Sequence, residues 1–224
     1  MSLTCGIDIG GTKIAGGVVD EEGTILEELR VVSPASSEEA IEEAVAGLVR
    51  ELRSRHDVRA VGVGAAGYVD RSRSVVMFAP NIAWRDVAMR ADLERRLDLP
   101  VVIENDANAA AWGEFRFGAG HDVEDLLLVT VGTGVGGGIV LDGALHRGAF
   151  GVGAEIGHMR VVPNGILCGC GNRGCFEQYG SGSALVREAR AAAAGGSLLA
   201  REVLDLAGGD PEAITGPLIT EAAR

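Results

Sequence analysis

A pattern of apolar strand, glycine-rich turn and apolar strand occurs twice in the chain. Residues 7–12 read Ile-Asp-Ile-Gly-Gly-Thr, and residues 129–134, which lie 122 positions later, read Val-Thr-Val-Gly-Thr-Gly. At the same offset, the apolar runs that follow end in Asp20 and Asp142. Glycine accounts for 34 of the 224 residues, so a chance match is the competing explanation. A real duplication predicts two related halves, each of which contributes one glycine-rich hairpin to a common cleft.

Segments typical of strands and helices alternate along the chain. Short apolar runs bounded by glycine predict strands, and apolar residues spaced by three or four positions predict helices. Ser36 is expected to cap the first helix, because Glu39 follows three residues later. The alternation predicts an α/β architecture. The expected strands are 5–20 (a hairpin), 24–32, 60–66, 75–77, 100–103, 126–131 and 138–141, and the expected helices are 37–52, 85–97 and 106–117.

The two glycine-rich turns are candidate phosphate-binding sites. A bound phosphate chain needs backbone N–H groups that point at it and no Cβ atom in the way. Asp8, at the end of an apolar strand, is expected to face the phosphates and to hold Mg²⁺ through water. Neither turn is a Walker loop, and two ordinary hairpins are the alternative. The candidate residues, which include the one lysine of the chain, are Asp8, Gly10, Gly11, Thr12, Lys13, Gly132, Thr133 and Gly134.

A polar segment, Glu104-Asn105-Asp106, follows the apolar strand at 100–103. Open α/β sheets place ligands at the carboxyl ends of their strands. The helix dipole and the first amides keep a carboxylate at a helix N-terminus ionised. Asp106 is therefore suited to accept a hydroxyl proton during phosphoryl transfer. The alternative is that Asp106 is an ordinary helix N-cap.

Three cysteines occur within eight residues in the spacing C-x-C-x4-C, and a histidine lies ten residues before the first. Thiolates and an imidazole are typical ligands of tetrahedral zinc. Four protein ligands would close the site, so the expected zinc is structural rather than hydrolytic. Free thiols and a disulfide are the alternatives, and Cys5 is expected in the core. The expected ligands are His158, Cys168, Cys170 and Cys175.

Two carboxylates, Glu155 and Glu177, flank this metal loop in the sequence. Carboxylates are good acceptors for the several hydroxyl groups of a sugar. Ordinary solvated acids are the alternative. If zinc fixes the loop, both acids are expected to point into the cleft.

Together these residues resemble the ROK family (repressors, open reading frames and kinases), and within it the bacterial ATP-dependent glucokinases. The resemblance covers the chain from Cys5 onward. Its most specific parts are the segment Glu155-Ile156-Gly157-His158 and the cysteine cluster, in this order and spacing. The other segments that carry it are 8–13, 79–81, 104–109 and 132–138.

The resemblance implies an α/β protein with an actin-like, hexokinase-type ATPase fold, whose two α/β domains close on ATP and sugar. A small domain is expected over residues 1–103 and part of a large domain over 104–224. The resemblance implies that Asp106 is the catalytic base for the sugar 6-hydroxyl. It also implies zinc on the four ligands above, tuning sugar binding through His158. The implied sugar contacts are Asn105, Asp106, Glu155, His158, Glu177, Gly67 and Asn81.

The expected reaction is the ATP-dependent phosphorylation of glucose. A kinase for another hexose or an N-acetylhexosamine, and a non-catalytic sugar-binding member of the family, are the alternatives. A sugar-responsive repressor would carry a helix-turn-helix domain, which does not precede Cys5. Family kinases continue past residue 224, so the second domain is expected to be incomplete and the chain to be a fragment or a truncated product.

The charge balance argues against a general nucleic-acid binder. Lys and Arg number 20 and Asp and Glu number 32, which gives a net charge of −12, whereas phosphate contacts need a basic face. No apolar run approaches the ~18 residues of a membrane span, and no basic leader opens the chain. We expect a cytoplasmic protein whose partners are a sugar and ATP, with no nucleic-acid or membrane partner. The resemblance implies a homo-oligomer, a dimer or a tetramer.

Overall fold

The computed structural model describes residues 2–34, 37–79 and 84–224, and their contacts divide the chain into two compact units. Unit 1 comprises Met1–Leu128 and Gly137–Ala154, and unit 2 comprises Val129–Gly136 and Glu155–Arg224. Asp106 and its helix therefore lie with the N-terminal residues. The predicted domain division after residue 103 stays a prediction. Each unit is described below by itself.

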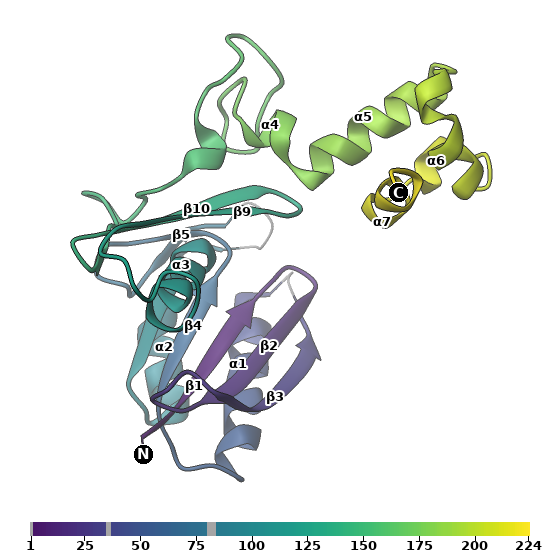
Figure 1. The fold of residues 1–224 in the computed structure, drawn as a ribbon. Helices are drawn as coiled ribbons and strands as arrows, with labels where there is room; N and C mark the ends of the chain where they lie inside the picture. The colour runs from purple at the N-terminus through teal and green to yellow at the C-terminus, as the bar shows by residue number, and fades with distance from the viewer. Residues whose placement is uncertain (1, 35–36, 80–83) are drawn as a thin grey trace. The chain divides into compact units, whose positions relative to one another are not determined.

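Unit 1 is built on five strands: β1 (Leu3–Ile9), β2 (Lys13–Val19), β3 (Ile25–Val32), β4 (Val58–Ala65) and β8 (Val101–Asn105). They form one sheet in the order β3-β2-β1-β4-β8 (Figure 1). Strand β2 is antiparallel to both of its neighbours, β1 and β3, whereas β4 runs parallel to β1 and β8 runs parallel to β4. Cys5, Ile7 and Ile9 of β1 are buried and the residues between them are exposed, so the alternation sets which face the core covers.

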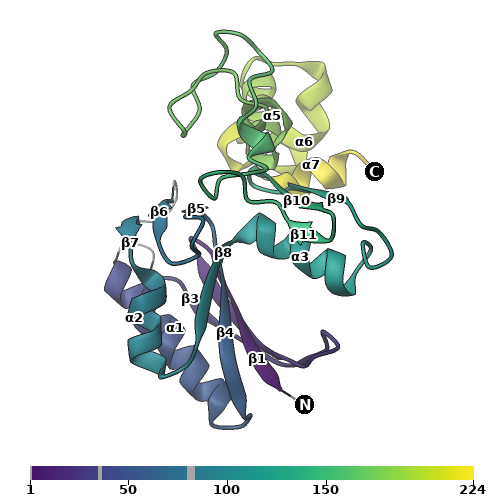
Figure 2. The same ribbon diagram turned by 90° about the vertical axis from the view of Figure 1, so that its left-hand side faces the viewer.

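Helices α1 (Glu38–Arg53) and α2 (Met89–Leu97) cover one face of this sheet, and α3 (Asp106–Phe117) lies on the other (Figure 2). Leu48 of α1 lies over Gly16, whereas Ala109 of α3 lies next to Gly64. The apolar spacing predicted helix α1 correctly, and its Ile41 is fully buried. The predicted bounds of α3 are confirmed.

The cap of α1 corrects the sequence prediction. Ser37, not Ser36, is the N-cap: its backbone is extended and its hydroxyl accepts a hydrogen bond from the Ala40 N–H at 3.3 Å. Ser36 lies outside the described residues. The physical reason is the position of the first helical residue. Helix α1 begins at Glu38, so the N-cap is Ser37, whose hydroxyl reaches the amide three residues ahead.

The predicted helix over 85–97 is wrong in its first turn. Residues Arg85–Val87 form β7, which pairs with β6 (Val76–Phe78), and β6 pairs with β5 (Tyr68–Val69). Asp86 has a positive φ of 53°, which a right-handed helix does not accept. The helix therefore begins only at Met89.

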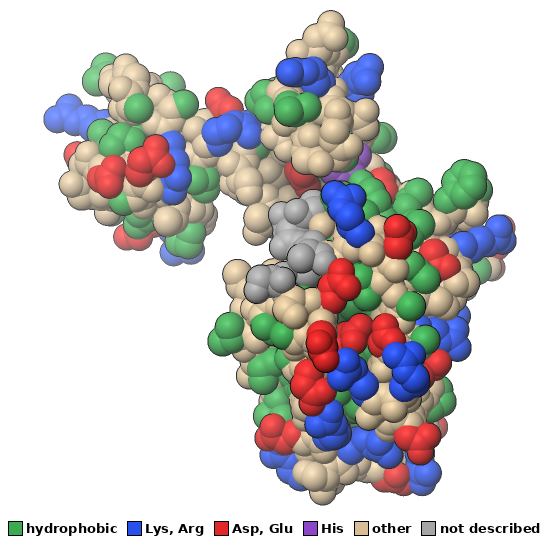
Figure 3. Space-filling view, turned by 180° about the vertical axis from the view of Figure 1, so that it is seen from behind, with side chains coloured by type: hydrophobic (Ala, Val, Ile, Leu, Met, Phe, Trp, Pro, Cys, Tyr) green, Lys and Arg blue, Asp and Glu red, His purple; other side chains and the backbone are tan. Residues whose placement is uncertain are grey.

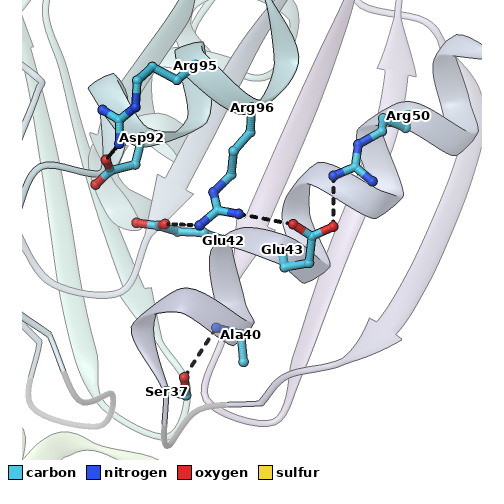
Figure 4. Close-up of polar contacts among 8 residues, drawn as sticks. All are labelled: Ser37, Ala40, Glu42, Glu43, Arg50, Asp92, Arg95 and Arg96. Atoms are coloured by element: carbon cyan, nitrogen blue, oxygen red, sulfur yellow. Dashed lines mark hydrogen bonds and ion pairs between the residues drawn. The ribbon is translucent and has the colours of Figure 1, made fainter.

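A buried carboxylate joins α1 to α2 (Figure 4). Glu42 of α1 is 6% exposed, and Arg96 of α2 lies 3.3 Å from it and 3.1 Å from Glu43. Burial raises the pKa of Glu42, the charge of Asp92 raises it further, and Arg96 lowers it. On this face of unit 1, acidic side chains lie among basic side chains (Figure 3).

Unit 2 holds a glycine-rich turn, a cysteine-rich loop and a group of helices. The turn joins β9 (Leu126–Val131) to β10 (Val135–Leu141), and β11 (Ala144–Leu145) completes their sheet. Residues 126–128 of β9, residues 137–141 of β10 and all of β11 belong to unit 1. The prediction of β9 is confirmed, and β10 begins three residues before its predicted start. The helices are α4 (Glu177–Gly180), α5 (Gly182–Ala194), α6 (Arg201–Leu206) and α7 (Gly216–Ala222).

A small separate core holds the last helices of unit 2 together. Ala193, Ala200, Val203 and Ile214 form it, and Ile214 is fully buried. Among the described residues, no helix is both long and apolar enough to cross a membrane.

Candidate active site and metal centre

The strand β8 ends and α3 begins at Asn105 and Asp106. Asn105 has extended backbone angles, and its side chain accepts a hydrogen bond from the Asn108 N–H at 3.0 Å. Asn105 is therefore the N-cap, and the alternative that Asp106 caps the helix is wrong. Asp106 is the first helical residue, and the capping bond from the Asn108 N–H goes to Asn105 instead.

The contacts of Asp106 bring three predicted sugar-site residues together in unit 1. Oδ1 of Asp106 accepts hydrogen bonds from the Ala107 N–H at 2.9 Å and from Asn105 Nδ2 at 3.0 Å. Asn105 Nδ2 also donates to the Gly67 carbonyl at 3.1 Å. At Gly67 a Cβ atom would lie 2.6 Å from the Phe78 carbonyl oxygen, so this close approach needs glycine. Asn81 lies outside the described residues.

The electrostatics of Asp106 differ from the sequence expectation. Its side chain borders a hollow of about 500 Å³ in unit 1. Burial raises the pKa of Asp106, and the charge of Asp8 raises it further, while the bonds from Ala107 and Asn105 lower it by less. The pKa of Asp106 thus lies above its ordinary value. Above that pKa the carboxylate is a stronger proton acceptor than a free aspartate.

The first glycine-rich turn joins β1 to β2, as predicted. The Gly10 N–H donates to the Lys13 carbonyl at 3.0 Å, and Gly11, Thr12 and Lys13 are exposed. Asp8 borders the same hollow as Asp106. The structure therefore places the predicted Mg²⁺ residue and the predicted base at one hollow of unit 1. The role of the turn in phosphate binding stays a prediction.

The second turn is held from two sides within unit 2. The Val135 N–H donates to Oε2 of Glu177 at 3.0 Å, and a Cβ on Gly134 would lie 2.4 Å from that oxygen. The first amide of α5, at Gly182, donates to the Gly132 carbonyl at 2.8 Å. Glu177 therefore contacts the turn directly, a relation that the sequence did not suggest. Its predicted contact with sugar stays untested.

A hollow of about 770 Å³ lies beside this turn, within unit 2. Gly132 and Thr133 form one wall, and residues of α5 form another. Sequence reasoning missed the charged residues of this hollow, although Arg187 and Arg190 stand three positions apart, on one helical face. Arg190 forms an ion pair with Glu212, in which Nη1 lies 3.0 Å from Oε2. The hollow offers both glycine backbone and cationic groups to a ligand.

The four predicted metal ligands meet in unit 2. The ligand atoms of His158, Cys168, Cys170 and Cys175 all lie within 4.8 Å of one another, and all three cysteines are free thiols. Cys168 Sγ is 3.6 Å from His158 Nδ1, and Cys170 Sγ is 3.7 Å from Cys175 Sγ. Tetrahedral zinc with bonds of ~2.3 Å spaces its ligands about 3.8 Å apart. The donor set therefore fits zinc, and it argues against a disulfide.

The surroundings of the cluster fit a thiolate centre. Gln178 Nε2 lies 3.7 Å from Cys168 Sγ and Asn172 Nδ2 lies 3.6 Å from Cys170 Sγ, so both amides donate toward sulfur. His158 turns Nδ1 to the sulfurs and Nε2 toward Glu155 Oε2, 4.0 Å away. One imidazole thus links the metal loop to a predicted sugar ligand.

Cys5, the remaining cysteine, lies apart from the cluster in β1. It is buried, as predicted, and burial raises the pKa of its thiol to about 11. At neutral pH the thiol is therefore protonated and serves as a small apolar core residue.

Comparisons with known proteins agree with the predicted resemblance. The family model described as "ROK family" matches residues 4–219. Glucokinase from Streptomyces coelicolor is 54% identical over 224 residues, covering 100% of this chain and 70% of the relative. The resemblance inferred from the sequence is confirmed.

Solved structures give the same result. A ROK family glucokinase from Streptomyces griseus, in complex with glucose and AMPPNP, is 55% identical with a TM-score of 0.89, covering 100% of this chain and 71% of that one. A ROK hexokinase from Thermus thermophilus is 40% identical with a TM-score of 0.76, covering 99% and 74%. The expected α/β fold of the hexokinase type is confirmed.

Proposed function

Since this chain belongs to the ROK family, we propose that it is an ATP-dependent glucokinase that forms ADP and glucose 6-phosphate. The observation that carries the proposal is the setting of Asp106. Its carboxylate stands at the start of α3, bound to Asn105 and next to Asp8, with its pKa raised. The likeness to a glucokinase crystallised with glucose and AMPPNP supports glucose and ATP as substrates.

In the proposed reaction Asp106 is the general base. The hydrogen bonds from Asn105 and Ala107 both fall on Oδ1 of Asp106, and we assign the proton transfer to Oδ2. The glucose 6-oxygen attacks the γ-phosphorus, the bond from that phosphorus to the ADP oxygen breaks, and the hydroxyl proton passes to Asp106. Asp106 and Asn105 also orient the sugar, together with Gly67 and Asn81.

Groups on this chain are assigned to ATP as well. Backbone N–H groups of Gly11 and Thr12, with Lys13, are suited to phosphate, and so are those of Thr133 and Gly134. The N–H groups of Gly10 and Gly132 are bonded within their own turns, so these two glycines contribute by their lack of a Cβ atom. The hollow beside that turn, with Arg187 on its wall, is suited to the rest of the nucleotide. Asp8 offers the oxygen ligand that Mg²⁺ prefers, and the ion when bound neutralises phosphate charge.

The metal loop has a structural role in this proposal. His158, Cys168, Cys170 and Cys175 would hold the zinc, which would fix the loop that carries the proposed sugar ligands. Nε2 of His158 lies on the Glu155 side of the ring, and we assign His158, Glu155 and Glu177 to glucose, as the resemblance implies. The reaction is placed in the cytoplasm, and a homo-oligomer is proposed, as the resemblance implies.

An ADP-release assay over a panel of hexoses tests the proposal. It is run on the 224-residue chain and on a version extended to the length of the relatives, with glucose, mannose, fructose and N-acetylglucosamine. ADP release that depends on glucose, in equal amount with glucose 6-phosphate, is expected. Absence of glucose-dependent release from both chains would contradict the proposal.

A further inference from the structure

A forked ion pair joins β8 to the segment after β11, within unit 1. Nε and Nη2 of Arg147 each lie 2.7 Å from Oε2 of Glu104. The two side chains are largely buried, with 26% of Arg147 and 14% of Glu104 exposed. Arg147 Nη1 also donates to the Leu145 carbonyl at 3.4 Å. A residue 43 positions away in the sequence therefore fixes the orientation of Glu104.

The other oxygen of Glu104 holds the start of α3. Oε1 accepts hydrogen bonds from the Asn105 N–H at 3.2 Å and from Asn108 Nδ2 at 3.3 Å. Asn108 is 1% exposed, so its amide is placed by packing. Asn105 in turn donates to Asp106 Oδ1 at 3.0 Å. Arg147 is thus linked to the carboxylate of Asp106 through Glu104 and Asn105, which bonds Glu104 by its backbone N–H and Asp106 by its side-chain amide.

We propose that Arg147 is a positioning residue for Asp106, acting through Glu104 and Asn105. Two charge-assisted bonds hold Oε2 of Glu104 in place, which leaves Oε1 directed to the start of α3. With Glu104 fixed, the cap of α3 and the Asn105 amide are fixed too. The claim that this serves catalysis rests on the proposed function, whereas the positioning itself is a property of unit 1.

The pair also sets the charge near Asp106. The titratable groups that border the same hollow are Asp8 of β1, Glu28 of β3 and Glu104 of β8. Arg147 compensates the charge of Glu104, which stands two residues from Asp106. Without Arg147 that charge loses its ion-pair partner, and a nearby like charge makes a carboxylate harder to ionise. Removal of Arg147 and removal of the charge of Glu104 are therefore expected to shift the pKa of Asp106 in opposite directions.

A carboxyl-carbon NMR titration of Asp106 in the full 224-residue chain tests the proposal. Arg147→Ala is expected to raise the pKa of Asp106 by about half a unit or more. Glu104→Gln is expected to lower it, and the double variant is expected to lack the rise. Arg147→Lys is expected to restore part of the effect, because an ammonium supplies charge without the fork. Arg95→Ala, which removes an exposed ion-paired arginine of α2, is the control without a shift.

An Asp106 titration that is unchanged in Arg147→Ala would overturn the proposal. If that variant does not fold, the titrations of Arg147→Lys and Glu104→Gln decide, and no change in both overturns it. In a kinase assay, Arg147→Ala is expected to lower kcat about 10-fold or more and to leave the KM for glucose within about 3-fold. A wild-type chain without glucose kinase activity would refute the proposed function and leave the titration result standing.

Discussion

At the scale of single residues, the chemistry depends on how Asp106 is surrounded. Two forces oppose each other at its carboxyl: burial and Asp8 favour the protonated form, and the Ala107 N–H and the Asn105 amide favour the charged form. Burial and Asp8 prevail, so the folded chain holds Asp106 with a raised pKa. A carboxyl group whose pKa is shifted by burial and by a neighbouring charge is typical of functional sites.

Replacing Asp106 with asparagine is expected to lower kcat by about 10²–10⁴-fold, the usual contribution of a general base. Glucose binding, measured by calorimetry, is expected to persist, because asparagine keeps a hydrogen-bonding oxygen. Glu188→Gln, on the exposed side of α5, is the matched control. An unchanged kcat in Asp106→Asn would exclude this residue as the base.

The raised pKa also predicts opposite pH effects on rate and on stability. The rate should fall as the pH drops through the folded-state pKa of Asp106, because the base becomes protonated. Stability from this residue is present below the unfolded pKa and is lost as the pH rises through the folded pKa. Asp106→Asn should therefore raise Tm at pH 7 and not near pH 3.8, the ordinary value. A Tm gain that is equal at both pH values would contradict the assigned cause.

At the scale of elements, local sequence predicted helices and strands better than it predicted the joins between them. The bounds of α3 and β9 follow from apolar spacing and from the polar residues at their ends. The first turn of the expected helix at 85–97 fails because the pairing of β7 with β6, and the positive φ of Asp86, override local preference. The Glu104–Arg147 pair was not foreseen, because nothing local relates two residues 43 positions apart.

The contact between α1 and α2 predicts unequal effects of its two partners. Arg96→Ala leaves Glu42 buried without its cation and is expected to destabilise unit 1 by about 1–3 kcal/mol, below the cost of breaking a fully buried pair because Arg96 is partly exposed. Glu42→Gln removes the desolvated charge and is expected to cost less. Urea unfolding measures both. An equal or larger loss in Glu42→Gln would contradict the pKa shift assigned to burial.

Two glycines of the metal loop offer a matched comparison. Gly174 has a φ of 78°, and a Cβ there would lie 1.7 Å from the Val162 carbonyl oxygen, whereas a Cβ on Gly169 meets no atom within 4 Å. Gly174→Ala is expected to lower zinc content well below that of the wild type, and Gly169→Ala to leave it unchanged. Metal analysis by mass spectrometry decides. Equal zinc content in both variants would refute a tightly wrapped loop.

At the scale of the whole molecule, the two units have separate cores. Unit 1 is held by a large core that includes Ile9, Val45 and Leu93, and the last helices of unit 2 by the small core around Ile214. The sequence predicted that His158, Cys168, Cys170 and Cys175 come together in unit 2, because C-x-C-x4-C with a histidine is a specific pattern. The sequence could not reveal the hollow beside the second turn, because the walls of that hollow come from segments that are far apart in the sequence, such as the turn itself and Glu212.

Zinc removal is expected to affect the units differently. We expect about one zinc per chain, and a chelator should release it with loss of structure in the loop. Hydrogen exchange should then increase in residues 155–180 and stay unchanged in β1 and β4, which lie in the core of unit 1. Equal increases in both regions, or a stable fold without metal, would contradict the structural role.

The most direct test of the central claim is a crystal structure of the chain with glucose bound. The proposed mechanism predicts the 6-hydroxyl oxygen within about 2.6–3.2 Å of Oδ2 of Asp106, the reach of a general base. A glucose molecule bound with that hydroxyl oxygen beyond hydrogen-bond reach of both carboxylate oxygens of Asp106 would contradict it.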